Sequence, residues 1–424
     1  MGDVYAGGVF NITAVDCRSS AEGLLPVQRD TLLPILPTRG DSIHSGSTVG
    51  LPKQEFESDV IFSELLSRAW VYQEVLLAPA NLFCATEQMW WSCSGGTCSQ
   101  TFPDSIHKFH IASSFEKSFT SLKRGMNALD LETTSVSVAI GWMNILESYT
   151  NTSATRPDDR LVAIAGLAAT YQSSFPNFLK DSTYHSAIWS HEICRQLLWE
   201  GQARPDASFP SSRLPTTHPM PSWSCASYNG PIKYQRTKGI SLLPVKVVNL
   251  ASSGLDKFGR AASLEQCVLH LRGVLVPMTF RPTTPSSHAH GYGLQTVAYP
   301  AGHEDALVDV VWDNTEELES AAALALTTDD YVRAVLFQCD FDYTLYGTIL
   351  GLLLRPCISS QSTTGLRRWV RCGLVKKSVD DNKLEYYQLA LRVSRYGMTF
   401  RRDGYHFVRQ KSLNTVVVDD IYIV

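Results

Sequence analysis

The hydrophobic and polar positions of residues 64–77 predict one helix that is apolar on both of its faces. Two stripes run at helical spacing: Leu65, Ala69, Tyr72 and Leu76 form the first, and Leu66, Trp70, Gln73, Glu74 and Leu77 form the second. Pro79 ends the helix, because a proline cannot continue it. A helix that is apolar all round is typically buried, so Gln73 and Glu74 are predicted to be buried polar groups.

Glu74 is the unusual residue of this helix. A buried carboxylate without a partner destabilises the folded state by several kcal/mol. Glu74 is therefore expected to be paired, protonated or at the wall of a cleft, and Arg68 is the nearest candidate partner. Two interpretations stay open: a structural ion pair or hydrogen-bonded network, and a catalytic or ligand-binding carboxylate.

The patterns on either side of this helix predict further elements. The passage from Val4 to Ala14 has the apolar content of a strand, interrupted by Gly7-Gly8, and residues 31–55 have the composition of a surface loop. Residues 81–84 and 88–92 are predicted to form a hairpin. Residues 115–200 are expected to be mostly helical, with helices over 136–149, 160–171 and about 183–199 and with Asp159 as the N-cap of the second.

From about residue 240 the apolar period changes to two, which predicts strands. Their candidate ranges are 267–272, 306–312, 331–339, 345–354, 368–375, 385–393 and 415–424. Seven short strands with turn residues between them favour a mainly antiparallel sandwich or barrel. The same alternation places His270 on the solvent face, without a function. The whole chain is therefore predicted to be of mixed α+β class.

Composition restricts the classes of function. The chain has 424 residues, of which 44% are apolar and 18% charged, as is typical of a soluble globular protein with two or three domains. Its formal net charge of −4 gives no reason to expect nucleic acid or an anionic membrane as a partner. Neither a secretory signal nor an apolar run of the roughly 20 residues of a membrane span is visible. The cysteines are therefore expected to be reduced.

Searches of the sequence for catalytic and metal sites give no candidate. Cys93 and Cys98 could be half of a zinc site or a redox pair, but no second pair of ligands follows at suitable spacing. His191-Glu192 begins a metallopeptidase motif in which Arg195 replaces the second histidine. Nucleophile elbows, phosphate-binding loops and kinase motifs are missing, and the basic residues have no aromatic platform for nucleic acid. We therefore predict no catalytic residue, no metal and no cofactor.

One run of residues resembles a known family. Arg68-Ala69-Trp70-Val71-Tyr72-Gln73-Glu74, followed by Leu77, Trp91 and Cys93, resembles the closing motif of the fungal heterokaryon incompatibility (HET) domain, R-G/A-W-x-x-Q-E-x-x-L and then an aromatic-x-Cys. Residues 3–14, with Gly23-Leu24 and Arg29 after them, resemble the element that precedes this motif. Two still earlier motifs, Y-x-x-L-S-Y-x-W-G and L-W-I-D-x-L-C-I-x-Q, are absent from the sequence. Residues 1–93 thus resemble a HET domain without its N-terminal half.

Later segments resemble the region that follows the HET domain in this family. The run from Asp158-Asp159-Arg160 to Ala168 is similar to D-R/K-L-x-A-I-x-G-L-A, and Pro221-Ser222-Trp223 opens a run similar to P-S-W-S-W-A-S. Cys225 replaces the second Trp of that run, and because a thiol is much smaller than an indole, packing there must differ. These matches predict three regions: the C-terminal half of a HET domain (1–93), a mostly helical middle region (94–239) and a β-rich C-terminal domain (240–424).

The resemblance implies the remnant of an α/β, TIR-like domain and a role as a signalling or interaction module. That module would act in the cytoplasm, in fungal non-self recognition and programmed cell death, through protein partners or self-association. One alternative is a TIR-like enzyme that cleaves NAD with a Glu in a cleft, although nothing around Glu74 matches the TIR catalytic motif. Another is a gene fragment without autonomous function. An upstream exon that encodes the two absent motifs would identify the chain as part of a full HET protein.

Overall fold

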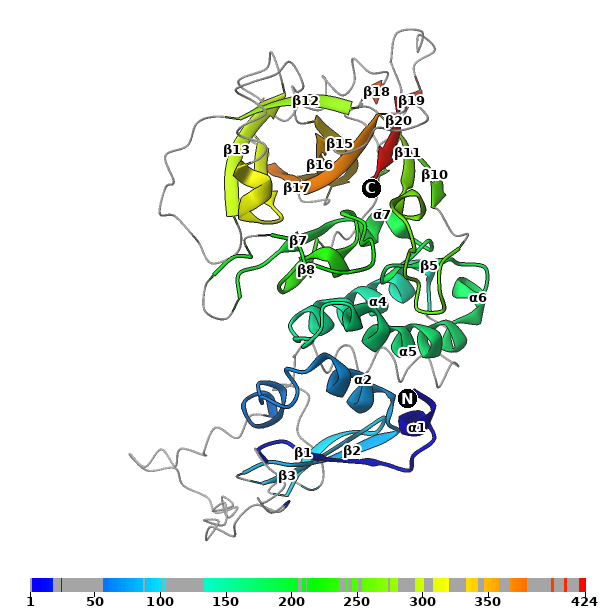
Figure 1. Cartoon of the computed structure of the whole chain (residues 1–424), viewed down its shortest axis with the longest axis vertical. Coiled ribbons are helices and arrows are strands. Elements are labelled where there is room, and N and C mark those ends of the chain that lie inside the picture. The colour runs from blue at the N-terminus through cyan, green and yellow to red at the C-terminus, as the bar shows by residue number, and fades with distance from the viewer. Residues whose placement is uncertain are drawn as a thin grey trace, which may run out of the picture. The chain divides into compact units, whose positions relative to one another are not determined.

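The computed structural model divides the chain into two compact units, residues 1–180 and 181–424, and each is described by itself. The described residues are 2–17, 24, 56–86, 88–100, 103, 133–204, 208–210, 212–235, 241–242, 246–250, 254–273, 275–280, 294–300, 308–319, 333–341, 347–357, 367–379, 398–399, 408–409 and 419–424. Helices and strands occur in both units (Figure 1), so the protein has the predicted mixed α+β class.

The first unit contains a four-stranded sheet and a set of helices (Figure 1). In sheet order the strands are β1 (Asn11–Ala14), β2 (Ala80–Cys84), β3 (Met89–Cys93) and β4 (Gly96–Ser99). The helices are α1 (Gly2–Ala6), the π-helical turn η1 (Glu57–Ile61), α2 (Ala69–Leu77), α4 (Ser135–Thr150), α5 (Asp159–Ser174) and α6 (Pro176–Leu179). β1 runs parallel to β2, and β2 and β3 form the predicted hairpin. Within this unit α2 lies between the sheet and the pair α4 and α5.

The helix α2 is shorter at its start than the predicted helix over 64–77. Ser153 N donates a hydrogen bond to Ser67 O at 2.6 Å, and Ala69 N donates to Ser153 O at 2.9 Å. These two bonds hold Arg68 in an extended conformation (φ −90°, ψ 129°), so the helix begins at Ala69. It ends at Leu77 as predicted, because Ala78 is extended before Pro79.

The predicted strand over Val4 to Ala14 is wrong in its first half. Residues 2–6 form α1, and Gly7 N donates a hydrogen bond to Asp3 O at 3.0 Å, which closes the last helical turn. The pair Gly7-Gly8 then ends the helix, since glycine weakens helices and favours their ends. Only residues 11–14 are a strand.

The helices predicted over 136–149 and 160–171 are confirmed as α4 and α5. The Thr134 side chain accepts a hydrogen bond from Ser137 N and caps α4. The predicted N-cap of α5 is wrong: Asp158 occupies that position, although its side chain makes no capping hydrogen bond, and Asp159 is the first helical residue. A carboxylate in the first turn is still favourable beside the positive end of the helix dipole. Among the described helices, none is both long and apolar enough to cross a membrane.

The boundary between the units, at 180/181, differs from the predicted boundaries at 93/94 and 239/240. Tyr72 of α2 donates a hydrogen bond to Ile145 O of α4 at 3.1 Å, and its ring lies 5.8 Å from that of Tyr149. Helices of the predicted middle region therefore share a core with α2. In the other unit, Arg371 donates to Leu197 O at 2.7 Å, so residues before 239 belong with the β-rich region.

The start of the second unit is not the helix that residues 183–199 were expected to form. Its elements are β5 (Tyr184–His185), β6 (Ile188–Trp189), the short helix α7 (Ile193–Gln196), β7 (Trp199–Gly201), the 3-10 turn η2 (Cys225–Ser227) and β8 (Ile232–Tyr234). Ser186, Ala187 and Glu192 have φ angles of 48°, 70° and 49°. A right-handed helix does not allow positive φ, so the chain turns into the β5–β6 hairpin instead.

The rest of the second unit is a ten-stranded sheet that is mainly antiparallel, as predicted. Its strands are β9 (Ser241–Leu242), β10 (Lys246–Leu250), β11 (Leu269–Gly273), β12 (Leu275–Phe280), β13 (Leu294–Pro300), β14 (Val308–Trp312), β15 (Arg333–Phe341), β16 (Gly347–Pro356), β17 (Arg368–Val379) and β20 (Asp419–Ile423), with η3 (Leu264–Cys267) before β11 and the separate pair β18 (Met398–Thr399) and β19 (Val408–Arg409). Six strands close into a ring in the order β17-β14-β13-β12-β15-β16, because β16 also pairs with β17. The predicted strand over 385–393 and the predicted loop over 31–55 lie outside the described residues.

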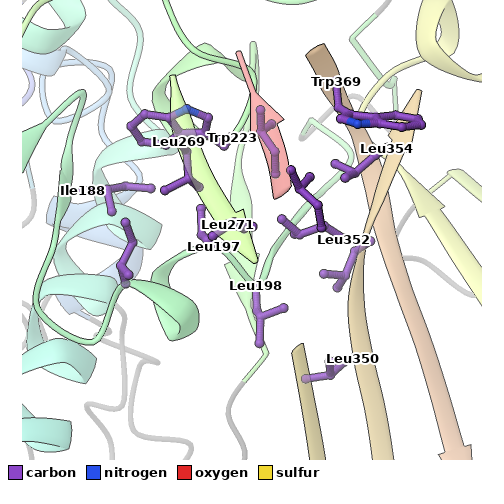
Figure 2. Close-up of a cluster of buried hydrophobic side chains, with 14 of the residues drawn as sticks. Ile188, Leu197, Leu198, Trp223, Leu269, Leu271, Leu350, Leu352, Leu354 and Trp369 are labelled. Atoms are coloured by element: carbon purple, nitrogen blue, oxygen red, sulfur yellow. The ribbon is translucent and has the colours of Figure 1, made fainter. Parts of the chain in front are cut away.

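The core of the second unit follows the predicted period of two in β11 and β20, where Leu269 and Leu271, and Ile421 and Ile423, are fully buried (Figure 2). In β16 both faces are buried, because Leu353 is as fully buried as Leu350, Leu352 and Leu354. Trp223 and Trp369 pack in the same cluster. Each of these buried aliphatic side chains contributes about 1.5–3 kcal/mol relative to an exposed one, so this cluster is a main source of the unit's stability.

Candidate functional site

The sheet of the first unit has one fully buried face. Strand pairing puts four buried residues in one row across β1, β2, β3 and β4: Thr13, Phe83, Trp90 and Ser99. Phe56 packs against the rings of Phe83 and Trp90 at centroid distances of 5.6 and 5.4 Å. Asn81, two residues before Phe83, donates a hydrogen bond to Val75 O of α2 at 2.9 Å. This face of the sheet therefore packs toward α2.

The opposite face of the same sheet is apolar and partly exposed. Pairing places Ile12, Leu82, Trp91 and Cys98 in one row, and we call this row, together with Phe10, the open face. Ile12 is 51% exposed and Phe10 is 45% exposed. The other three members are half-buried, and the Phe10 ring lies 5.8 Å from that of Trp91. Of the residues expected to matter, Trp91 belongs to this face, and Cys93 lies on the same side of β3.

The outer edge of β1 adjoins the open face. Val15 N donates a hydrogen bond to Cys84 O at 3.1 Å, so the backbone groups of alternate residues face β2, and those of Ile12 face away from it. In the part of the chain that the structure describes, no strand pairs with this outer edge. Residues 4–15 contain no charge, although edge strands are commonly protected by charged residues or proline. The open face and this edge form the candidate functional site.

The motif residues of α2 lie on the other side of the sheet. Arg68 is exposed, Trp70 and Glu74 are half-buried, and Gln73 is buried together with the apolar motif residues Ala69 and Leu77. The predicted pairing of Glu74 with Arg68 is wrong, since Glu74 interacts with Tyr5 of α1 instead. Burial raises the pKa of the Tyr5 phenol, and the hydrogen bond to Glu74 and its negative charge raise it further. Glu74 therefore has a neutral partner from a segment that was predicted to be a strand.

Gln73 marks a close approach of α2 to α5. A Cβ on Gly166 would lie 2.0 Å from Gln73 Nε2, so the amide occupies the space that the glycine leaves. Gln73 Oε1 is buried and has no hydrogen-bond partner among the described residues. The structure thus brings together two of the predicted segments, those around Gln73 and Gly166. It does so through packing, which favours the structural interpretation of this pair.

Asp159 and Arg160 lie at the start of α5, and the contacts of Arg160 are structural. The Arg160 side chain is buried, with its guanidinium 6.0 Å from the centre of the Tyr149 ring. Tyr149 Oη donates a hydrogen bond to Arg160 O at 2.5 Å. These contacts attach the start of α5 to the end of α4.

Among the described residues, the cysteines do not gather into a recognisable metal centre. Burial raises the pKa of the Cys98 thiol, and the neighbouring Cys93 raises it further, so Cys98 does not have the lowered pKa of a reactive thiol. No three His, Cys, Asp or Glu side chains gather in a metal-binding arrangement among the described residues. Metal analysis of the purified protein remains the test of the prediction that no zinc is bound.

Pro221-Ser222-Trp223 joins the distant ends of the second unit. All three residues are buried. Ser222 N donates a hydrogen bond to Val424 O at 3.1 Å, the Ser222 hydroxyl also bonds to that oxygen, and Trp223 Nε1 donates to Cys267 O at 2.8 Å. Next to them Cys225 is fully buried, with Tyr234 Oη 3.5 Å from its Sγ. This segment is a structural junction.

A buried cluster of charges lies beside this junction. Arg371 is 0% exposed and Asp313 is 1% exposed, and Arg371 Nη2 donates to Asp313 Oδ1 at 3.2 Å. Arg213 bonds Asp313 at 2.9 Å and Glu317 at 3.3 Å, and Arg355 bonds Glu317 at 2.5 Å. Burial lowers the pKa of Arg371, whereas Asp313 raises it. Each charge has an opposite partner within the cluster, which is the arrangement of a stabilising ion-pair network.

His185 is a second buried ionisable group of this unit. It is 0% exposed, with Nε2 at 2.6 Å from Gln266 O and Nδ1 at 2.9 Å from Ser186 Oγ. A carbonyl oxygen only accepts, so we assign the proton to Nε2 and the donating role at Nδ1 to the serine hydroxyl. Burial lowers the pKa of His185. The serine and histidine are neighbours as in a nucleophile pair, but the buried position gives a substrate no access to them.

The comparisons with known proteins do not identify the chain. No family model matches it, and no match is found among the curated proteins or among the solved structures. The resemblance to the HET domain therefore stays a prediction that rests on the quoted motifs.

Sequence patterns missed the members of the open face other than Trp91. In β1 the alternation of Phe10, Asn11, Ile12 and Thr13 is visible in the sequence. It indicates a strand with one apolar face, and such a face is normally assigned to the core. Here Thr13 is buried and Ile12 is exposed. The sequence shows that β1 has one apolar and one polar face. Only the fold shows that the polar face is the buried one.

Proposed function

We propose that this chain is a protein–protein interaction module of the HET type, which acts in the cytoplasm in fungal non-self recognition and programmed cell death. The observation that carries the interaction role is the open face of the first unit, an apolar row of aromatic and aliphatic side chains at the solvent. Contiguous exposed apolar patches are uncommon on isolated proteins and mark interaction sites. Aromatic residues are enriched at such sites. The open face lies in the unit whose sequence resembles the HET domain.

The residues around α2 support this proposal by holding the sheet rigid. The Asn81 hydrogen bond to α2 and the packing of Phe56 on Trp90 attach the sheet's buried face to the helical layer. A surface on a rigid sheet binds at a lower entropic cost than a surface on a loop. NAD cleavage is the alternative function, with Glu74 as the only candidate carboxylate that the motif supplies. The Glu74 carboxylate already accepts a hydrogen bond from Tyr5, which is a structural contact.

The proposed function is tested by expressing the chain in a filamentous fungus during incompatible cell fusion. We expect the chain alone to cause no death, and we expect it to lower the fraction of fused cells that die, because it occupies the surface that its partners use. The double variant Phe10→Ser, Ile12→Ser should lose this effect. Both side chains are largely exposed, so the fold should be retained.

The matched control for this experiment is Val4→Ser, Phe62→Ser. These two apolar residues are 73% and 77% exposed and lie outside the open face, so the control chain should act like the original. An original chain that leaves the dying fraction unchanged at verified expression would reject the proposed role.

A further inference from the structure

We propose that the outer edge of β1 pairs with the same edge of a second copy of this chain, antiparallel and across a two-fold axis. The two four-stranded sheets would then join into one. This inference rests on the proposed interaction function and names the partner of the same site.

The backbone geometry of β1 supplies the register. The hydrogen bond from Val15 N to Cys84 O shows that the backbone N–H and C=O groups of the odd-numbered residues of β1 point toward β2. The N–H and C=O groups of Phe10, Ile12 and Ala14 consequently point away from the sheet. A two-fold axis at Ile12 sets Ile12 opposite its own copy, and this pair exchanges two hydrogen bonds. Phe10 and Ala14 then stand opposite each other on both sides of the axis and can add further bonds.

This register also matches side chains of like character. Ile12 meets Ile12 on the open face, and Phe10 meets Ala14, so the apolar rows of the two copies become continuous. On the other face Asn11 meets Thr13. Within one chain these two residues already form a hydrogen bond of 3.3 Å from Asn11 Nδ2 to Thr13 Oγ1. Cross-strand pairs of these kinds each stabilise a sheet.

The charge pattern favours a second copy as the occupant. In a two-fold pair every charge on the edge strand faces or neighbours its own copy, and like charges directly opposite destabilise a sheet. Many proteins use such charges to prevent edge pairing. Residues 4–15 contain none, and the nearest charges are Asp3 and Asp16. A partner of opposite charge would find nothing on this strand to recognise, whereas an identical apolar strand fits it.

The experiment measures the molar mass of the full chain by light scattering and sedimentation velocity over about 1–100 µM, the range of Kd values expected of a small interface. The original chain should form a dimer. Ile12→Lys puts two ammonium groups opposite each other and should weaken dimerisation at least tenfold. Ile12 is half exposed, so the melting temperature should not fall when it is compared at a concentration at which both chains are monomeric. Val9→Lys is the matched control, since Val9 is 85% exposed and lies outside the paired residues.

The outcomes separate this inference from the proposed function. A dimer that Ile12→Lys disrupts and Val9→Lys leaves intact supports it. An original chain that is monomeric throughout, or a dimer that Ile12→Lys leaves unchanged, overturns it. A fall in the melting temperature of Ile12→Lys at a concentration at which both chains are monomeric shows that another segment of the same chain covers the edge, and this also overturns it. If a monomeric chain still lowers cell death in the fungal assay, the proposed function stands and only the homotypic partner is rejected.

Discussion

The two largest sheets of the described residues, the four-stranded sheet of the first unit and the ten-stranded sheet of the second, differ in whether their strand edges are paired. In the second unit six strands close into a ring, so each of them has neighbours on both sides and their edges are satisfied. In the first unit the sheet is open, and Ile12 and Phe10 remain at the solvent beside the outer edge of β1. Closure removes the edges through which sheets associate. The comparison shows where pairing with a further strand is structurally possible: at the outer edge of β1, and not within the ring.

The units also differ in what they bury. The second unit buries charges and pairs each of them, as in the contact of Arg371 with Asp313. The first unit buries a neutral amide, Gln73, against a glycine of the neighbouring helix, and its buried arginine, Arg160, lies near the Tyr149 ring. Four changes test these differences, and they follow from the largest expected effect to the smallest.

Arg371→Met should destabilise the second unit by about 3–5 kcal/mol, because it breaks a fully buried ion pair and leaves the Asp313 carboxylate with only one of its two guanidinium partners, Arg213. Chemical denaturation followed by tryptophan fluorescence measures this loss. Arg272→Met is the matched control. Its partner Asp420 and Arg272 itself are both exposed, so the control should change stability by less than about 1 kcal/mol. Equal losses in the two variants would show that the buried network is not special.

Gly166→Ala should destabilise the first unit by about 1–3 kcal/mol, since the added methyl group meets the buried Gln73 side chain. Alanine is otherwise the better helix former, by about 1 kcal/mol. In a Gln73→Ala background the same substitution should therefore become neutral or stabilising. Thermal unfolding of the four proteins in this cycle gives the coupling. Additive effects would mean that Gln73 does not fill the space above Gly166.

Acidification should destabilise the second unit through His185. Burial lowers the pKa of His185 below the 6.5 of the free side chain, so below pH 6.5 the unfolded chain binds a proton that the folded chain does not. Stability is thus fully present above the unfolded pKa and falls as the pH drops toward the folded pKa. His185→Gln should flatten this dependence of the melting temperature between about pH 7.5 and pH 5. A slope that the variant leaves unchanged would assign the titration to other groups.

The smallest effect is expected for Glu74→Gln in the presence of NAD. Glu74 interacts with Tyr5 and lacks a matching catalytic motif, so the purified chain should release no nicotinamide, and the variant should behave identically. Chromatography of nicotinamide after incubation with NAD measures this. Release that depends on Glu74 would favour the NAD-cleaving alternative over the interaction module.

Local patterns were sufficient where an element's own residues decide its structure. The alternation around Leu269 and Val310 predicted strands, and the hairpin at 81–92 and the helices α4 and α5 were predicted from turn residues and helical spacing. The end of α2 was predictable because Pro79 acts locally. The mixed α+β class and the antiparallel character of the second unit followed from these elements.

Tertiary contacts decided the rest. Backbone hydrogen bonds that join Ser67 and Ala69 to Ser153, a residue distant in the sequence, determine where α2 begins. Positive φ angles at Ser186 and Glu192 replace a predicted helix with a hairpin. The pairing of Glu74 with Tyr5 and the exposure of Ile12 depend on which segments lie next to them. Sequence spacing records which residues can share a face, but only packing determines whether that face is covered. The sequence therefore determined the strand at β1, and the fold decided that its apolar side faces the solvent.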